Sequence, residues 1–280
     1  MSKKLFSVAA AAALAAIGVL TGSVSAQDTI SNSEISLTVN ADGSIQDVIK
    51  DVGGFWNYGV PAIGFGIDSS NGYGNQYGNL GSSSFVATSG IVGGSIVTNG
   101  AWGNLEYTRT YSLSSNNVNI STVITNHSTD AETFKFFDAG DPDQGVPRGG
   151  SFNSFNDVNG LYAIATNSSG LPPDLVKFST TDPTAVLTFL PGLYIGDSFT
   201  LSSVFASPYD PNFADQDIGM AIIWERTLLG GQSVTLDYVQ SYGTASETGV
   251  SVPEPSTFAL LGLGAVGAAV AAIRRRRQAV

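Results

Sequence analysis

Apolar and polar residues alternate along residues 28–242 with the two-residue period of β-strands. In the stretch 105–113 the apolar set is Leu105, Tyr107, Tyr111 and Leu113, and polar side chains fill the positions between them. Residues 118–124 and 234–238 show the same alternation. The region shows no convincing 3.6-residue period of an amphipathic helix. The pattern predicts strands that bury one face.

Turn-forming sequences separate these runs at Asp42-Gly43, Ser115-Asn116-Asn117 and Gly230-Gly231. Short strands spaced by such turns are typical of antiparallel sandwiches. The strands outnumber those of an immunoglobulin-like domain, so we expect an all-β fold in the form of a large antiparallel two-sheet sandwich. The expected strands are 35–39, 44–49, 62–68, 84–88, 91–98, 104–113, 117–125, 131–138, 161–166, 174–179, 185–190, 199–205, 218–225 and 233–241.

The run from Thr108 through the turn Asp141-Pro142-Asp143 resembles the galactose-mutarotase-type supersandwich. The resemblance implies a supersandwich-like architecture as one form of the expected sandwich. It implies nothing about activity, because no catalytic pattern of that family can be matched to these residues.

Two segments have compositions that do not build a core. Residues 71–84 are rich in Gly, Asn and Ser and predict a long exposed loop. Tyr73 and Tyr77 in this loop could stack on sugar rings, and a plain flexible loop is the alternative. Residues 243–252 predict a linker.

The first 26 residues have the three parts of a secretory signal peptide. Lys3 and Lys4 precede an apolar stretch at 5–20, and Val24 and Ala26 provide the small residues of a cleavage site. We expect a signal helix that signal peptidase removes after Ala26. A retained membrane anchor is the alternative, which the short apolar run disfavours.

The C-terminal residues 253–280 combine three features in a fixed order. Pro253, Glu254 and Pro255 favour an extended, accessible segment, because proline lacks a backbone donor and biases the preceding residue away from helix. Residues 258–273 are uncharged and predict a single transmembrane helix, about 24 Å long against a hydrocarbon core of about 30 Å. The positive charges that would hold its end in the cytoplasm are Arg274, Arg275, Arg276 and Arg277. A buried core helix with a basic tip is the alternative.

This order of parts resembles the PEP-CTERM sorting signal of exported bacterial proteins. The resemblance implies transient insertion into the inner membrane and processing by an exosortase-type transpeptidase. It further implies release or attachment at the cell surface, alongside the exopolysaccharide of a biofilm. We therefore divide the chain into a signal peptide (1–26), an all-β sandwich domain (27–242), a linker (243–252) and a sorting signal (253–280).

Removal of both terminal signals leaves a strongly acidic body. Residues 27–252 keep six of the 12 basic residues and 22 of the 23 acidic ones, a formal charge of −16. This charge disfavours nucleic acid and anionic membranes as partners, and it is compatible with divalent cations or neutral polysaccharide. The chain has no cysteine, which excludes disulfides, thiolate metal sites and thiol catalysis.

Two aspartate-rich segments are candidates for a calcium site. The residues concerned are Asp138, Asp141 and Asp143 in the first segment, and Asp210, Asp215 and Asp217 in the second. Calcium takes six to eight oxygen ligands, which loops dense in Asp and Asn can supply. Neither segment matches the EF-hand or the glycine-rich nonapeptide pattern. The alternative is that these residues simply form turns.

Arg109 lies on the apolar face of 104–113, where a charge needs a partner. We expect it to form a buried ion pair with an aspartate of the 138–143 segment. This expectation competes with the calcium site for the same acids.

Candidates for catalysis are few. His127 is the single histidine, and no Gly-x-Ser-x-Gly motif accompanies it. Glu225 follows Trp224 at the end of an apolar run and is the first candidate for glycoside hydrolysis, unless it pairs with Arg226. We assign no catalytic residue.

The sequence favours a non-enzymatic surface or matrix protein. The alternatives are a secreted carbohydrate-active enzyme and a calcium-stabilised sugar-binding module.

Overall fold

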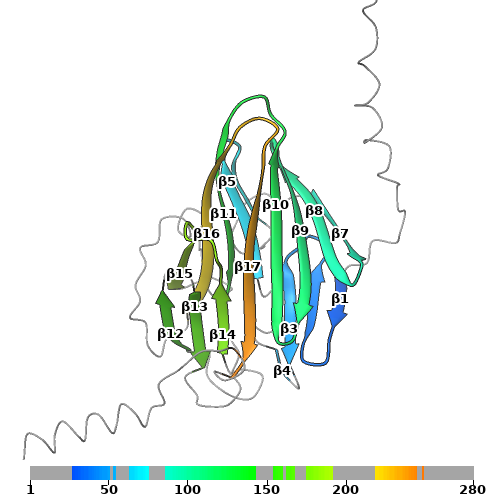
Figure 1. Ribbon diagram of the computed structural model, residues 1–280, viewed down its shortest axis with the longest axis vertical. Helices are drawn as coiled ribbons and strands as arrows, with labels where there is room; N and C mark the ends of the chain where they lie inside the picture. Colours follow the sequence, from blue (N-terminus) through cyan, green and yellow to red (C-terminus); the bar gives the residue numbers. More distant parts are fainter. Residues whose placement is uncertain are drawn as a thin grey trace, which may run out of the picture.

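The computed structural model describes residues 27–50, 53–54, 63–75, 86–142, 154–159, 162–167, 175–191, 218–244 and 248. Every regular element in these ranges is a β-strand, and the strands form two antiparallel sheets that face each other (Figure 1). The expected all-β two-sheet sandwich is therefore confirmed. No helix in the described ranges is long and apolar enough to span a membrane. The predicted signal helix and the predicted transmembrane helix at 258–273 lie outside these ranges.

Sheet A has nine strands within the described residues, in the order β1-β2-β3-β5-β11-β16-β15, with β4 paired to β3 and β6 paired to β5. Its strands are β1 (Gln27–Ser31), β2 (Ser36–Asn40), β3 (Ile45–Lys50), β4 (Gly53–Gly54), β5 (Ile63–Ser69), β6 (Gly72–Asn75), β11 (Glu132–Gly140), β15 (Val186–Pro191) and β16 (Ile218–Leu228).

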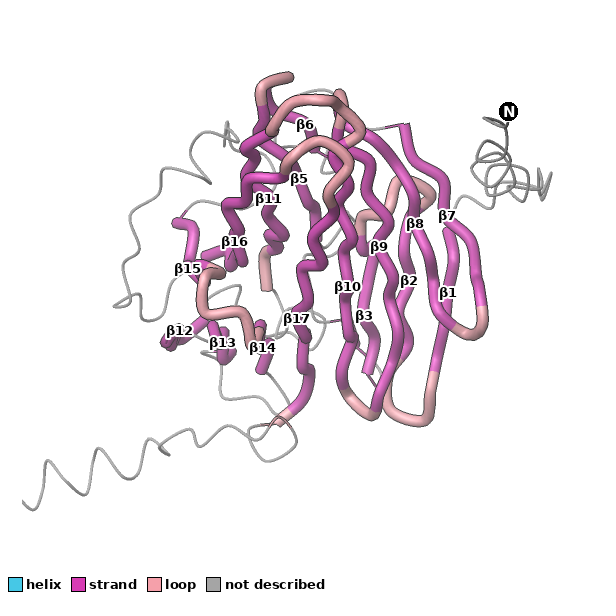
Figure 2. The backbone as a smooth tube through the Cα atoms, turned by 45° about the horizontal axis from the view of Figure 1, so that its top comes forward, coloured by secondary structure: helices cyan, strands magenta, loops and turns pink. Residues whose placement is uncertain are grey.

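Sheet B has eight strands within the described residues, in the order β12-β13-β14-β17-β10-β9-β8-β7. Its strands are β7 (Val86–Val92), β8 (Ser95–Trp102), β9 (Leu105–Ser114), β10 (Asn117–Asn126), β12 (Ser154–Asn159), β13 (Tyr162–Asn167), β14 (Leu175–Ser179) and β17 (Ser233–Gly243). Figure 2 shows β17, β10, β9, β8 and β7 side by side. The last strand, β17, thus lies inside the sheet, between β14 and β10.

Several sequence predictions need correction. The expected loop at 71–84 begins with β6, because Gly72–Asn75 pairs with β5. The expected strands 84–88 and 91–98 put the break between them at 89–90, which is wrong. The turn between β7 and β8 lies at Gly93-Gly94, and both glycines have positive φ. The strands β1, β4 and β12 were not expected. The expected strand 199–205 and Tyr77 lie outside the described residues.

The core fills the space between the two sheets. The expected alternation in 105–113 is confirmed, because Leu105, Tyr107 and Tyr111 are fully buried on the inner face of sheet B. The rings of Tyr107 and of Phe65 from sheet A make a T-shaped contact, with 5.3 Å between ring centroids. Trp224 of sheet A lies 5.9 Å from Tyr238 of sheet B. Aromatic side chains therefore join the two sheets at both of these places in the core.

Two crossovers at one end carry the chain between the sheets, from β10 to β11 and from β16 to β17 (Figure 1). Asn126 ties them together, because its backbone N–H donates to Gln232 O at 2.9 Å and its side-chain amide donates to Leu228 O at 3.0 Å. Gly230 lies so close to the other loop that a Cβ would meet Ser128 O at 2.5 Å. This close approach requires glycine.

Candidate functional site

Arg109 and Asp138 form an ion pair at the centre of the molecule. Arg109 projects from β9 in sheet B and Asp138 from β11 in sheet A, and their side chains are 1% and 0% exposed. The guanidinium Nη2 and Nη1 donate to the two carboxylate oxygens at 2.8 and 3.2 Å. The predicted buried pair between Arg109 and an aspartate of the 138–143 segment is confirmed. Asp138 lies within a strand, however, and not at the strand end that the sequence predicted.

The pair is the centre of a longer chain of buried hydrogen bonds. On one side, Arg109 Nε donates to Tyr111 Oη at 2.8 Å, and Tyr111 Oη donates to the carbonyl of Gly43, in the β2–β3 turn, at 2.5 Å. On the other side, Asp138 accepts a hydrogen bond from Tyr238, which in turn accepts one from Gln240 at 2.8 Å. The predicted turn at Asp42-Gly43 thereby supplies one end of a polar connection between the sheets.

Burial and charge act in opposite directions on this pair. Burial would lower the pKa of Arg109, but the negative charge of Asp138 outweighs it and raises that pKa above its ordinary value. The guanidinium therefore stays protonated at all working pH values. The face of Phe65 lies 4.1 Å from the guanidinium carbon and adds a cation–π contact. The pair is fully enclosed, so its role in the described structure is to hold the two sheets together.

Alkaline pH is expected to destabilise the protein through the tyrosines of this network. Burial raises the pKa of Tyr111 to about 12 and raises the pKa of Tyr238 well above its ordinary value. The unfolded chain loses these protons near pH ~10, so the two tyrosines should add no pH dependence below pH ~10 and should lower the free energy of unfolding between pH ~10 and ~12. Urea unfolding across this pH range measures the fall. A free energy of unfolding that stays constant to pH ~12 would contradict the assignment.

The calcium hypothesis stays a prediction. The structure uses both carboxylate oxygens of Asp138 for Arg109, and it places Asp141, 1% exposed, directly after β11. The remaining predicted ligands lie outside the described residues, namely Asp143, Asp210, Asp215 and Asp217. Among the residues that are described, no group of three or more histidine or acidic side chains converges on a point.

The other candidates for chemistry lie on the surface. His127 Nε2 is 2.8 Å from Glu106 Oε2, and both side chains are more than half exposed. Glu225 is exposed and stands opposite Lys135 of β11, whereas Trp224 points into the core. The apolar context that the sequence suggested for Glu225 is therefore wrong.

The predicted pairing of Glu225 with Arg226 is replaced by another ion pair. The Arg226 guanidinium binds the carboxylate of Asp182. Its hydrogen bond to Glu225, at 2.7 Å, goes to the backbone carbonyl of that residue. The interaction with Asp182 fastens the segment after β14 to sheet A.

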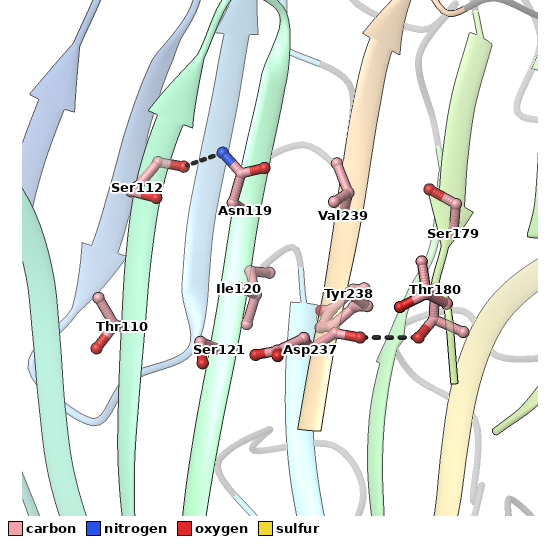
Figure 3. Close-up of a pocket in the computed structure, with 11 residues that line it drawn as sticks. Thr110, Ser112, Asn119, Ile120, Ser121, Ser179, Thr180, Asp237, Tyr238 and Val239 are labelled. Carbon is pink, nitrogen blue, oxygen red and sulfur yellow. Dashed lines mark hydrogen bonds between the residues drawn. The ribbon is translucent and has the colours of Figure 1, made fainter. Parts of the chain in front are cut away.

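A depression of about 400 Å³ lies on the outer face of sheet B (Figure 3). It is lined by residues of β9, β10, β17 and the end of β14, namely Thr110, Ser112, Asn119, Ile120, Ser121, Ser179, Thr180, Thr181, Asp237, Tyr238 and Val239. Ile120 and Tyr238 turn their side chains into the core. The other side chains are small, and most of them are hydroxyls.

The strand register arranges these side chains in two rows across the sheet. Thr110, Ser121 and Asp237 stand opposite one another on β9, β10 and β17. Two residues along the strands, the second row consists of Ser112, Asn119, Val239 and Ser179. The Asn119 amide donates to Ser114 Oγ at 2.9 Å, within this outer surface. Such rows offer donors and acceptors at regular intervals to a ligand lying across the strands.

Sequence reasoning missed this depression. The alternation in 105–113, 118–124 and 234–238 did predict strands with one buried face and polar residues on the other. The register that aligns them across three strands, however, is not visible in the sequence.

Comparison with known proteins bears first on the tail. Residues 251–277 match the PEP-CTERM protein-sorting motif, so the chain carries the sorting domain of an exosortase substrate. This confirms the interpretation of residues 253–280 as a PEP-CTERM sorting signal. No curated protein matches this chain in sequence.

Solved structures with a similar fold are distant in sequence. A bacterial glucoamylase in complex with acarbose is 13% identical, with a TM-score of 0.50 over 81% of this chain and 34% of that one. A galactose mutarotase related enzyme from Lactobacillus acidophilus is 10% identical, with a TM-score of 0.49 over 78% of this chain and 97% of that one. A putative aldose 1-epimerase from Escherichia coli K12 is also 10% identical, with a TM-score of 0.48 over 78% of this chain and 99% of that one. At these identities the similarity concerns the fold alone.

Proposed function

We propose that this chain is an exported, exosortase-processed protein of the cell surface or extracellular matrix, non-enzymatic and associated with exopolysaccharide. The observation that carries the proposal is the sorting motif at 251–277. Signal peptidase removes residues 1–26 during export, the C-terminal segment 258–273 holds the chain in the inner membrane, and the processing enzyme then acts at the Pro253-Glu254-Pro255 segment.

The body suits a polysaccharide-rich environment. Residues 27–252 carry a formal charge of −16, which repels nucleic acid and anionic lipid. The depression on sheet B presents hydroxyl and amide groups, which can both donate and accept hydrogen bonds with neutral sugars. These features support the association with polysaccharide.

A secreted carbohydrate-active enzyme is the second candidate, favoured by the fold shared with part of a glucoamylase. Turnover of a polysaccharide by the purified protein would support it. Binding of polysaccharide without turnover supports the non-enzymatic function instead.

Replacement of Pro253, Glu254 and Pro255 by alanine is expected to abolish processing, because it removes the extended segment ahead of the apolar run. The variant should stay in the inner-membrane fraction, with the C-terminal tail still attached. The matched control is Glu247→Ala, which removes a carboxylate outside the matched residues. Mass spectrometry of the C-terminus, in hosts with and without the processing enzyme, provides the measurement. Recovery of the wild-type chain from the cytosol with both ends intact would overturn the proposal.

A further inference from the structure

We propose that the depression on the outer face of sheet B is a binding site for a neutral polysaccharide chain that lies across the strands. This inference rests on the proposed function and deepens it, because it assigns the contact with polysaccharide to one face. The occupant follows from the geometry, charge and chemistry of the lining.

The geometry favours a linear chain. Adjacent strands in a sheet are about 4.8 Å apart, and side chains on one face recur about every 6.8 Å along a strand. The row of Thr110, Ser121 and Asp237 therefore offers one polar group per strand, at intervals suited to successive sugar units. The neighbouring row, which includes Asn119 and Ser179, runs parallel to it.

The charge of the lining favours a neutral ligand. The described residues that line the depression include no lysine or arginine, and Asp237 is their only charged side chain. An anionic polysaccharide would meet this carboxylate and the negative field of the body without a compensating cation. A second copy of this chain would bring the same negative charge and the same small polar side chains. A neutral glycan meets no such charge repulsion. The Asp237 carboxylate can accept two hydrogen bonds from the hydroxyl groups of the glycan.

The recognition works by hydrogen bonds and not by ring stacking. Among the described residues that line the depression, the aromatic one is Tyr238, which is 2% exposed and is hydrogen-bonded to Gln240 in the core. Individual hydrogen bonds to sugars replace bonds to water and contribute little each. Binding therefore needs several sugar units at once, and a polysaccharide should bind where its monosaccharide does not.

The wall of the depression is held in place before any ligand arrives. Thr180 is 8% exposed, and its hydroxyl donates to the Asp237 carbonyl at 2.8 Å (Figure 3). Two residues later, Asp182 pairs with Arg226 of sheet A. The loop wall is thus joined to the floor and to the opposite sheet, which reduces the entropy lost on binding.

Affinity electrophoresis of the full chain tests the proposal, in a detergent without a sugar headgroup and in gels that contain dextran, mannan or β-1,3-glucan. Alginate serves as the anionic counterpart. We expect at least one neutral polysaccharide to retard the protein, and alginate not to. Ser121→Arg places a long side chain in the middle of the first row and should weaken the association by about a hundredfold. Asp237→Asn keeps the shape and should weaken it by about tenfold.

The matched control is Thr227→Arg, which makes a similar change in size and the same change in charge at an exposed position on the outer face of sheet A. Its retardation should equal that of the wild-type protein, and thermal unfolding should show that the variants are folded. Absence of retardation by every neutral polysaccharide, or equal retardation of Ser121→Arg and wild type, would overturn the site. Neither result would affect the export and processing assay, so failure of this site and failure of the proposed function are distinguishable.

Discussion

Arg109→Ala is expected to lower the free energy of unfolding by about 3–5 kcal/mol, because it leaves Asp138 as an unpaired charge between the sheets. Asp138→Ala should have an effect of similar size, since the buried guanidinium then loses both of its carboxylate contacts. Urea unfolding followed by circular dichroism measures both losses.

The double variant Arg109→Ala/Asp138→Ala supplies the internal control. Its loss should be clearly smaller than the sum of the two single losses, because neither charge remains buried without the other. Additive losses would show that each residue acts through packing alone and would contradict the ion pair as the connection between the sheets.

Trp224→Ala should also destabilise the protein by about 3–5 kcal/mol, because it removes the largest side chain that is fully buried among the described residues. The Trp224 ring lies 6.0 Å from Phe136 of the same sheet and 5.9 Å from Tyr238 of the other, so the resulting cavity would adjoin both layers. The comparison is Trp102→Ala, because Trp102 is only partly buried and donates one hydrogen bond to Gly72 O at 3.0 Å. Its loss should be much smaller, as measured by the same urea unfolding. Equal losses for the two variants would show that Trp224 is not a central core residue.

The residues of β9 show what alternation can predict. The two-residue period placed Leu105, Tyr107 and Tyr111 on one face, and the exception to the pattern, Arg109, identified the buried ion pair. A charge within an apolar row needs a partner of opposite charge, and the predicted partner, an aspartate of the 138–143 segment, is the one that the structure shows. Apart from β7 and β8, the expected strands within the described residues begin within one residue of their predicted start.

Elements that depend on a partner were missed. The sequence Gly72–Asn75 has no apolar alternation and becomes β6 only because β5 offers it an edge. Near the β7–β8 turn, Ile91 and Val92 are apolar but 53% and 64% exposed. Their apolar character suggested the start of a strand at residue 91, whereas in the structure β7 ends at Val92 and the chain then reverses. Here the two glycines at 93 and 94, with φ of 59° and 83°, were the better signal.

The depression on sheet B could not be predicted for a related reason. Thr110, Ser121 and Asp237 are ordinary outward-facing residues when each strand is considered alone. They form a row only because β17 pairs with β10, from which it is separated by more than a hundred residues along the chain. Long-range register is a property of the assembled sheet.

The place of β17 inside sheet B sets the order in which a chain emerging with its N-terminus first can fold. Strands β7 to β10 are consecutive and can pair as soon as they leave a ribosome or a membrane pore, but β12, β13 and β14 reach them only through residues 233–243. Until that final strand arrives, the sheet exists as two fragments with open edges, on which foreign strands can add. Secretion of such a protein therefore favours a chaperone that covers these edges until translocation is nearly finished.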